Sequence, residues 1–272
     1  MNMKNYLNEL TNGLDQGYLN AMFLYDDVGS ELYRQRVAQP DYYLYRKERE
    51  LISEISHLFS GDKMLDIGSG VTDKLDPIKK NYNECWALDI DPESARASSD
   101  KYIVDSFLTH KNDDKDAFFM GSTCSNLTDN QIYQIIKNNR DIVIAVDIAK
   151  DEDVMVKAYT DPKGIGENME KQGLRNVNKW FDLNFPVESM TYECRWNPIT
   201  FIVETNLIFN ESYGCFIDSK GYHWKKGDKI RIGQLRKLMI HQWEWLFNQA
   251  GKVTDIYTTK DNWYAIYRVT SS

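Results

Sequence analysis

The apolar residues in the middle of the chain fall into five short runs separated by more polar segments. The runs cover residues 63–67, 85–90, 102–104, 117–120 and 141–148, and each is typical of a buried strand. The segments 94–101 and 129–138 have helical character, and the spacing of Thr128 and Gln131 predicts a capping box at the start of the second. An alternation of strands and helices indicates a parallel sheet. We therefore expect an α/β fold with a Rossmann-like sheet.

This alternation stops after residue 148. Up to residue 235 the chain has many aromatic residues, scattered glycines and short alternating runs at 193–195, 201–209 and 212–217, which favours an inserted lobe of mixed α+β structure. We expect a helix over 236–249 ended by Gly251, and strands over 253–258 and 263–269 that form a terminal antiparallel hairpin. The predicted domains are a sheet domain, 47–150 with 237–272, and a lobe, 1–46 with 151–236.

Composition narrows the choice of partner. The 272 residues, 42% of them hydrophobic, are enough for one large domain or for a sheet domain and a smaller lobe. A net charge of -8 without a Lys/Arg cluster argues against nucleic acid as a ligand. The polar N-terminal segment lacks the apolar core of a signal peptide, and no run approaches a membrane span, so we expect a cytoplasmic protein without a membrane partner. No His, Cys and Asp grouping has ligand spacing, so we expect no metal.

The first apolar run ends at a turn, Gly68-Ser69-Gly70, where a backbone can approach a ligand closely. The second run ends in Asp89 and Asp91, at the place where a doubly wound sheet carries its ribose-binding acid. An ordinary corner between a strand and a turn is the alternative for an isolated Gly-Ser-Gly. Taken together, the two run ends predict a bound adenosine moiety.

The residues after the turn favour S-adenosylmethionine over a dinucleotide. The third glycine of a dinucleotide fingerprint is absent, and Asp73 would repel a diphosphate, whereas S-adenosylmethionine carries no phosphate. Asp89 suits the ribose diol and Asp105 the adenine amino group, although either is also compatible with a solvated loop carboxylate. Lys74 can reach the methionine carboxylate or lie on the surface, and Asp91, followed by proline, is expected to start a helix.

Several motifs in order resemble one family. They are the Gly-Ser-Gly turn with Lys74 and the segments 25–30, 40–50, 119–127, 147–151 and 158–161. Over residues 24–161 the chain resembles the histidine N-alpha-methyltransferases of ergothioneine biosynthesis, which are relatives of the fungal dimethylallyltryptophan N-methyltransferases. The resemblance implies a Rossmann-like class I methyltransferase sheet, mostly parallel, with an inserted substrate lobe.

The resemblance also implies a set of cofactor residues. Phe107 joins Asp105 at the adenine, and Tyr42 lies at the edge of the site. The family has Gly-Asp-Phe where this chain has Asp105-Ser106-Phe107, so either Asp105 or Ser106 meets the adenine. The expected S-adenosylmethionine residues are Tyr42, Gly68, Ser69, Gly70, Lys74, Asp89, Asp105, Ser106 and Phe107.

For the methyl acceptor, the resemblance implies Tyr25 near the reactive amine, and Asn126 with Tyr159 at the substrate carboxylate. In the histidine enzymes an acid and a serine grip the imidazole, and those two positions fall on Gly233 and Leu235 here. Neither side chain forms hydrogen bonds, so we expect histidine to be a poor substrate. The replacement predicts a roomier and more apolar pocket, bordered by Val203 or Glu204 and by Arg231.

The sequence thus predicts an S-adenosylmethionine-dependent N-methyltransferase that acts on the amine of an amino acid or a similar small molecule and releases S-adenosylhomocysteine. Tyr25, a water that it orients, or bulk solvent takes the proton of the amine. The alternatives are O-methylation or another N-methylation in a biosynthetic pathway, and a non-catalytic binding protein that retains the fold. The acceptor, the number of methyl groups and the oligomeric state stay open.

Overall fold

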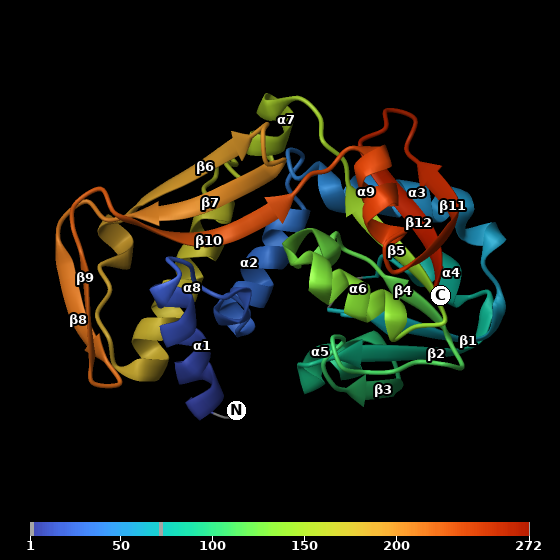
Figure 1. The fold of residues 1–272 in the computed structure, drawn as a ribbon, viewed down its shortest axis with the longest axis horizontal. Helices are drawn as coiled ribbons and strands as arrows, with labels where there is room; N and C mark the ends of the chain where they lie inside the picture. The colour runs from blue at the N-terminus through green and yellow to red at the C-terminus, as the bar shows by residue number, and fades with distance from the viewer. Residues whose placement is uncertain (1–2, 71–72, 272) are drawn as a thin grey trace. The chain divides into compact units, whose positions relative to one another are not determined.

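The computed structural model describes residues 3–70 and 73–271, which divide into two compact units (Figure 1). Unit 1 takes in the described residues of Met1–Tyr42 and Asp151–Leu235. Unit 2 takes in those of Tyr43–Lys150 and Arg236–Ser272. The chain therefore passes between the units after residues 42, 150 and 235, where the sequence analysis set the boundaries after residues 46, 150 and 236.

Unit 2 is built on a seven-stranded sheet with the order β11-β12-β5-β4-β1-β2-β3. Its strands are β1 Gly61–Ile67, β2 Tyr82–Asp89, β3 Lys101–Val104, β4 Asp116–Phe119, β5 Asp141–Asp147, β11 Gly251–Thr258 and β12 Tyr264–Ser271. Strands β1 to β5 pair in parallel, whereas β12 runs antiparallel to β5 and β11. The predicted fold, a mostly parallel Rossmann-like sheet with a terminal antiparallel hairpin, is confirmed.

Helices cover both faces of this sheet. They are α3 Tyr43–Ile55, α4 Asp76–Lys79, α5 Pro92–Ser98, α6 Asp129–Lys137 and α9 Ile240–Phe247. Apolar residues of α6 and α9 share one core with one face of the sheet, and those of α3 and α4 share a second core with the other (Figure 1). The predicted capping box of Thr128 and Gln131 is confirmed at the start of α6, and Asp91 caps α5 as expected. Burial on both faces explains why the central strands are continuous apolar runs.

The helix predicted over 236–249 was wrong at both ends. Arg236 is the last residue of β10, Lys229–Arg236, and α9 spans only Ile240–Phe247. Gly251 does not cap this helix but opens β11, where it pairs with Ser271. A Cβ at position 251 would lie 2.6 Å from the Thr270 carbonyl oxygen, so the glycine allows two strands to approach closely rather than ending a helix.

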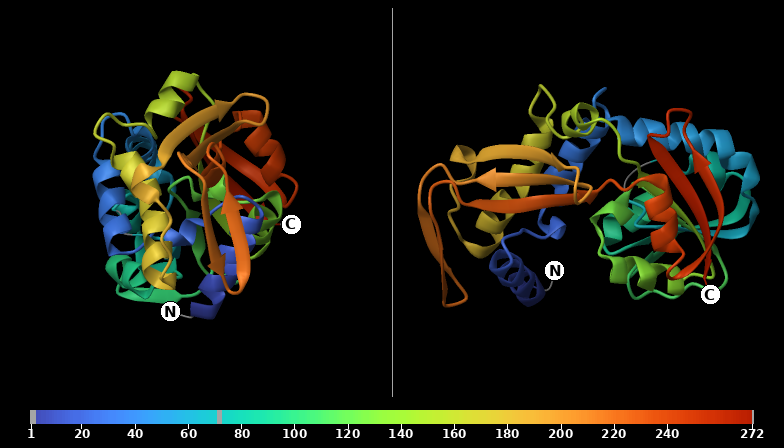
Figure 2. Two further views of the ribbon diagram at one scale, coloured as in Figure 1. Left: turned by 90° about the vertical axis from the view of Figure 1, so that its left-hand side faces the viewer. Right: turned by 45° about the horizontal axis from the view of Figure 1, so that its top comes forward.

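Unit 1 is mixed α+β, as predicted for the lobe. Its helices are α1 Met3–Asp15, α2 Asp27–Val37, α7 Glu152–Lys157 and α8 Ile165–Phe181. The strands β6 Thr191–Asn197, β7 Ile202–Ile208 and β10 form one sheet in the order β10-β7-β6, and β8 Tyr213–Ile217 pairs with β9 Lys220–Trp224 in a separate hairpin (Figure 2). Apolar side chains of α1, α8 and both sheets share a core.

The sequence analysis predicted no helix at α8, the longest helix of the described residues. Gly166 and Gly173 weaken its helical pattern, since glycine is a poor helix former. Both glycines sit where the helix is closely packed, because a Cβ at position 173 would lie 2.9 Å from Leu19 and one at 166 would lie 2.7 Å from the Tyr159 carbonyl oxygen. Tertiary packing thus outweighs local propensity here. Across the described ranges, no helix combines the length and the hydropathy needed to cross a membrane.

Candidate functional site

The carboxyl end of β1 forms a tight corner from Gly68, Ser69 and Gly70. Gly68 has φ +62° and Gly70 has φ +58°, a left-handed conformation that favours glycine. The Gly68 N–H donates to the Leu88 carbonyl oxygen at 2.8 Å, which ties the corner to the end of β2. Because neither glycine carries a side chain, the backbone of this corner is open to close approach by a ligand.

Asp89 at the end of β2 is joined to this corner. Its carboxylate accepts one hydrogen bond from the Gly70 N–H at 3.1 Å and another from the Asp91 N–H at 3.0 Å. These bonds fix the carboxylate beside the glycines, and each oxygen keeps a further lone pair. The structure therefore brings three predicted cofactor residues, Gly68, Gly70 and Asp89, to one place.

Two buried polar atoms near the corner have no hydrogen-bond partner, namely the Ser69 Oγ and the Asp66 Oδ1. Burial raises the pKa of Asp66 to about 6, and the nearby Lys74 opposes this rise. Carboxylates at positions 66 and 89 would repel a diphosphate, whereas they suit a ligand that offers hydroxyl donors and a positive charge. The residues present thus fit S-adenosylmethionine. Asp66 lies in β1, two residues before Gly68, and sequence reasoning assigned it no role.

The predicted Lys74 is 6% exposed and points toward Gly121. A Cβ at position 121 would lie 2.8 Å from the Lys74 Nζ, and Gly121 has φ +78°. The Gly121 N–H in turn donates to the buried Glu48 at 2.5 Å. Lys74 is therefore not the surface lysine of the alternative interpretation, and Gly121 is a close neighbour that sequence reasoning missed.

The third strand end carries Asp105, Ser106 and Phe107. The Phe107 ring lies 5.4 Å from that of Phe119 and within 3.9 Å of a Cβ built on Gly68, so this aromatic residue borders the corner. The Asp105 carboxylate accepts the Ser106 N–H at 2.7 Å, and its other oxygen lies 3.2 Å from His110 Nδ1. Phe107 thus borders Gly68, and the Asp105 N–H donates to the Asp89 carbonyl oxygen at 3.2 Å.

In unit 1 the structure brings the predicted Tyr42 and Tyr159 together. Their ring centroids are 6.2 Å apart and the rings meet edge to face. The guanidinium carbon of Arg36 lies 5.0 Å from the Tyr42 centroid and 4.7 Å from the Tyr159 centroid, within cation–π range of both. Arg36 was not among the predicted site residues.

Arg36 of α2 pairs with Glu170 of α8 inside unit 1. The Arg36 Nη1 lies 3.3 Å from the Glu170 Oε1, and each residue is only 5% exposed. Burial raises the pKa of Glu170, against the opposing effect of Arg36. Burial alone would lower the pKa of Arg36, but Tyr42 and Glu170 outweigh it, so this guanidinium stays charged. Sequence analysis could not place Glu170 among the buried residues of a helix, because it did not predict α8.

Tyr25 lies at the border of the same cluster. The residue as a whole is 53% exposed. Desolvation of its hydroxyl is the largest cause that raises its pKa to about 12, and the neighbouring Tyr42 and Glu170 add to the rise. At neutral pH this phenol is therefore protonated and a weak base.

The β10–β7 pair holds the positions that replace the histidine-binding side chains. A Cβ at Gly233 would lie 2.5 Å from the Thr205 Oγ1 and 3.4 Å from the Leu235 Cδ1. The expected roomier and more apolar space beside Gly233 is thus wrong, because the Thr205 hydroxyl fills it. Val203 is fully buried and lies on the same face of β7 as Thr205, while Glu204 lies on the other face.

The remaining predicted residue, Asn126, belongs to unit 2. It ends a 3-10 helix, Thr123–Asn126, in unit 2 and is exposed, whereas Tyr159 is 2% exposed and belongs to unit 1. Among residues 3–70 and 73–271, no group of three or more His, Cys, Asp and Glu side chains is arranged to hold a metal ion.

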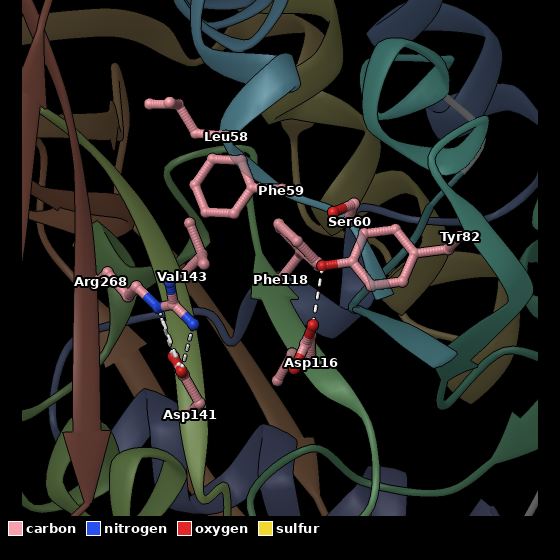
Figure 3. Close-up of a pocket in the computed structure, with 10 residues that line it drawn as sticks. Leu58, Phe59, Ser60, Tyr82, Asp116, Phe118, Asp141, Val143 and Arg268 are labelled. Carbon is pink, nitrogen blue, oxygen red and sulfur yellow. Dashed lines mark hydrogen bonds and ion pairs between the residues drawn. The ribbon is translucent and has the colours of Figure 1, made fainter. Parts of the chain in front are cut away.

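A small pocket in unit 2 lies away from this chemistry (Figure 3). It lies where β4 and β5 begin, so it is at the opposite edge of the sheet from the glycine corner. Its polar groups pair with each other: Tyr82 donates to Asp116 at 2.8 Å and Arg268 to Asp141 at 2.7 Å (Figure 3). The pocket is lined by Leu58, Phe59, Ser60, Tyr82, Asp116, Ala117, Phe118, Asp141, Val143 and Arg268.

The sheet and its glycine corner define the Rossmann-like class of S-adenosylmethionine-dependent methyltransferases. Residues 6–271 match the family described as histidine-specific methyltransferase, SAM-dependent, and the chain belongs to that family. S-adenosylmethionine is thus its cofactor.

Named relatives are distant. The chain is 26% identical over 212 residues to a histidine N-alpha-methyltransferase of Mycobacterium tuberculosis, and the match covers 66% of each chain, just under two thirds of the relative's length. It is 21% identical over 258 residues to N-methyltransferase imqF of Aspergillus flavus, covering 78% of this chain and 70% of the relative. Among solved structures, it is similar to the amino pentose methyltransferase CalS10 of Micromonospora echinaspora, with a TM-score of 0.47, 9% identity and coverage of 91% and 98%.

Proposed function

We propose that this protein transfers a methyl group from S-adenosylmethionine to the amine of an amino acid or a similar small molecule other than histidine. The observation that carries the proposal is the corner in unit 2, where Gly68 and Gly70 are left-handed, Gly70 donates to the Asp89 carboxylate and the buried Ser69 hydroxyl has no partner. Family membership supports the class of reaction. The names of its relatives, histidine and other N-methyltransferases, support nitrogen as the acceptor atom.

In this proposal the cofactor supplies an electrophilic methyl group on a sulfonium. Asp89 accepts hydrogen bonds from the ribose hydroxyls, and Lys74 pairs with the methionine carboxylate. Phe107 packs against the adenine, with Asp105 or Ser106 at its amino group, and Tyr42 completes the edge of the site. Unit 2 is then the cofactor-binding domain and unit 1 the acceptor-binding lobe.

The acceptor amine needs a neutral lone pair aligned with the carbon–sulfur bond, so the task of the protein is mainly positional. Tyr25 orients the amine, and Asn126 and Tyr159 hold the acceptor carboxylate. Because its pKa is raised to about 12, the Tyr25 hydroxyl stays protonated near neutral pH, and the proton of the amine passes to water.

Histidine is excluded in this proposal by the residues at positions 233 and 235. Gly233 has no side chain, Leu235 has no polar atom, and Thr205 fills the space beside Gly233. A site that reads an imidazole needs side chains that pair with its two nitrogens.

Mass spectrometry tests the proposal directly. Purified protein is incubated with S-adenosylmethionine and a panel of amino acids and amines that includes histidine, and both S-adenosylhomocysteine and methylated product are measured. Methylation of an amine other than histidine is the expected result. Histidine as the best acceptor would contradict the interpretation of positions 233 and 235, and titration calorimetry without heat for S-adenosylmethionine would contradict the cofactor site.

The same assay separates the other candidates. O-methylated product would show a hydroxyl acceptor. A binding protein that retains the fold would bind the cofactor without forming S-adenosylhomocysteine. Asn126→Ala and Tyr159→Ala extend the comparison, because an acceptor without a carboxylate would tolerate both substitutions.

A further inference from the structure

The Arg36–Glu170 pair in unit 1 has unmet hydrogen-bonding capacity. Nη1 of Arg36 reaches Glu170 Oε1, but Arg36 Nε, Arg36 Nη2 and Glu170 Oε2 have no hydrogen-bond partner. The Thr205 hydroxyl also opposes the rise in the Glu170 pKa, and its Oγ1 has no hydrogen-bond partner. Four buried polar atoms on α2, α8 and β7 therefore have unmet hydrogen-bonding capacity.

Such an arrangement is costly for a protein that uses it only for stability. A buried polar atom without a partner costs about 1–3 kcal/mol, and a buried ion pair is often no better than apolar residues of the same volume. Gly233 is also needed here, because a Cβ would lie 2.5 Å from the Thr205 Oγ1. A ligand that completes these bonds would give the cluster a use.

The free atoms define the chemistry of that ligand. Arg36 offers two donors on its Nε–Nη2 edge, and Glu170 offers one acceptor oxygen. The pair is already neutral as a whole, so a second carboxylate would meet Arg36 but face Glu170 as a like charge. A neutral group with an acceptor and a donor on the same side, such as a carboxamide, satisfies both residues.

This group is not the amine that receives the methyl. A nearby carboxylate favours the protonated form of an amine, which has no lone pair for the transfer. Glu170 at this position therefore suits a part of the acceptor that does not react. Because Arg36 and Glu170 are each 5% exposed, a ligand reaches them after a neighbouring side chain turns, and Tyr25, 53% exposed, borders the pair.

We propose that Arg36 and Glu170, with Thr205, recognise a neutral carboxamide-type group on the methyl acceptor, with its carbonyl oxygen on Arg36 and its N–H on Glu170. The inference rests on the proposed function and adds the substrate class to it. It replaces the apolar pocket expected from Gly233 and Leu235 with a polar one.

Four amino acids as acceptors test this assignment: glutamine, glutamate and methionine, which are similar in length, and histidine. We expect kcat/KM for glutamine to exceed that for methionine and glutamate by at least about 10-fold, since a site built to pair polar groups rejects ligands that lack them. Titration calorimetry of the same amino acids in the presence of S-adenosylhomocysteine gives the order of affinity without turnover.

Glu170→Gln tests the role of the charge. It removes the like charge and adds an N–H donor, so the preference for glutamine over glutamate should fall by at least about 10-fold. Glu167→Gln is the matched control, because Glu167 lies on the same helix and pairs with Lys171, but its side chain is exposed. Arg36→Met combined with Glu170→Met removes the pair as a whole without leaving a buried charge, and should make methionine the best of the four acceptors.

The outcomes separate the two proposals. A preference for histidine or methionine in the wild-type protein, or equal behaviour of Glu170→Gln and Glu167→Gln, overturns the carboxamide site while methyl transfer to an amine stands. Absence of S-adenosylmethionine binding, or of transfer to every amine, overturns the proposed function and this inference together.

Discussion

Tyr25 is the residue that the proposal assigns to positioning the acceptor amine rather than to accepting its proton. Desolvation, Tyr42 and Glu170 raise its pKa to about 12, so the phenol is protonated at every pH below that value. We expect Tyr25→Phe to lower kcat by about 10-fold or more through lost positioning. The pH at which the rate rises should not change, because that rise reflects the loss of a proton from the acceptor amine. Rates measured from pH 6 to pH 10 check this.

Tyr102→Phe is a suitable control for that experiment. Tyr102 of β3 is 37% exposed and its hydroxyl accepts a hydrogen bond from Arg96 in unit 2, so its loss should change neither the rate nor the pH profile. A rise of the rate at alkaline pH that is present in the wild-type protein and absent in Tyr25→Phe would identify Tyr25 as the base instead.

Asp89 and Asp91 form a natural pair for testing the cofactor site. Asp89 holds the Gly70 N–H, whereas Asp91 accepts the Ser94 N–H as the cap of α5. Asp89→Asn should weaken S-adenosylmethionine binding by about 10-fold or more, as expected for the loss of a charged hydrogen-bond partner. Asp91→Asn should keep the cap and the affinity, since both residues are good caps. Calorimetric titration of both variants decides the matter, and equal affinities would remove Asp89 from the ribose site.

At this scale the sequence predicted residues by type and position but not their partners. It identified the glycine corner and Asp89 because both follow apolar runs along the chain. It missed Arg36 and Glu170 because they are 134 positions apart and meet only through the packing of α2 on α8. The roles of all these residues stay predictions, whereas their neighbourhoods are features of the structure.

Among the elements, the strands of the parallel sheet were predictable and the lobe was less so. Buried strands are continuous apolar runs, so β5 and its neighbours were found within a few residues of their ends. The strands β9 and β10 of unit 1 were not predicted. They are partly exposed and carry glycine at positions 221 and 233, which hides a period of two.

Gly251 offers a test of the corrected element boundary. As a helix stop, position 251 would have the left-handed φ that favours glycine, but Gly251 is not among the glycines with positive φ. As the first residue of β11 it has no room for a Cβ, which would lie 2.6 Å from the Thr270 carbonyl oxygen and 2.9 Å from Val269. We therefore expect Gly251→Ala to lower the free energy of unfolding by about 1–3 kcal/mol, the usual cost of overpacking. Urea unfolding measures it.

Gly221→Ala in β9 provides the comparison for Gly251→Ala. The nearest atom to its Cβ would be in the Phe216 ring at 3.4 Å, an ordinary contact. This variant should unfold at nearly the wild-type urea concentration. A loss of the same size at both positions would mean that the close approach at Gly251 is not its cause, because the backbone-entropy effect of replacing glycine by alanine stabilises a protein.

For the whole molecule, one buried carboxylate connects the three places where the chain passes between units. Asp147 at the end of β5 accepts hydrogen bonds from Tyr43 at 2.7 Å and from Lys150 at 2.6 Å, and it pairs with Lys237 at 2.7 Å. Tyr43 is the first residue of unit 2, and Lys150 is the last residue before the chain returns to unit 1. Lys237 is the second residue after the chain enters unit 2 again. All are in unit 2, so the sheet itself fixes the near end of every connecting segment.

Asp147→Asn should therefore destabilise the protein more than most single substitutions. The change leaves Lys150 and Lys237 buried beside a neutral amide, and breaking a buried charge pair costs about 3–5 kcal/mol. Burial opposes the charged form of Asp147, but Lys150 and Lys237 outweigh this effect and lower its pKa. The stability that Asp147 contributes is therefore present above its unfolded pKa and is lost as the pH falls through the lowered pKa of the folded state.

Asp141→Asn, at the other end of β5 with the half-exposed Arg268, is the matched control and should cost much less. Urea unfolding at pH 7 compares the two, and limited trypsin digestion should cut Asp147→Asn first near residues 150 and 237. Equal stability of both variants would show that the connecting segments are held by other contacts.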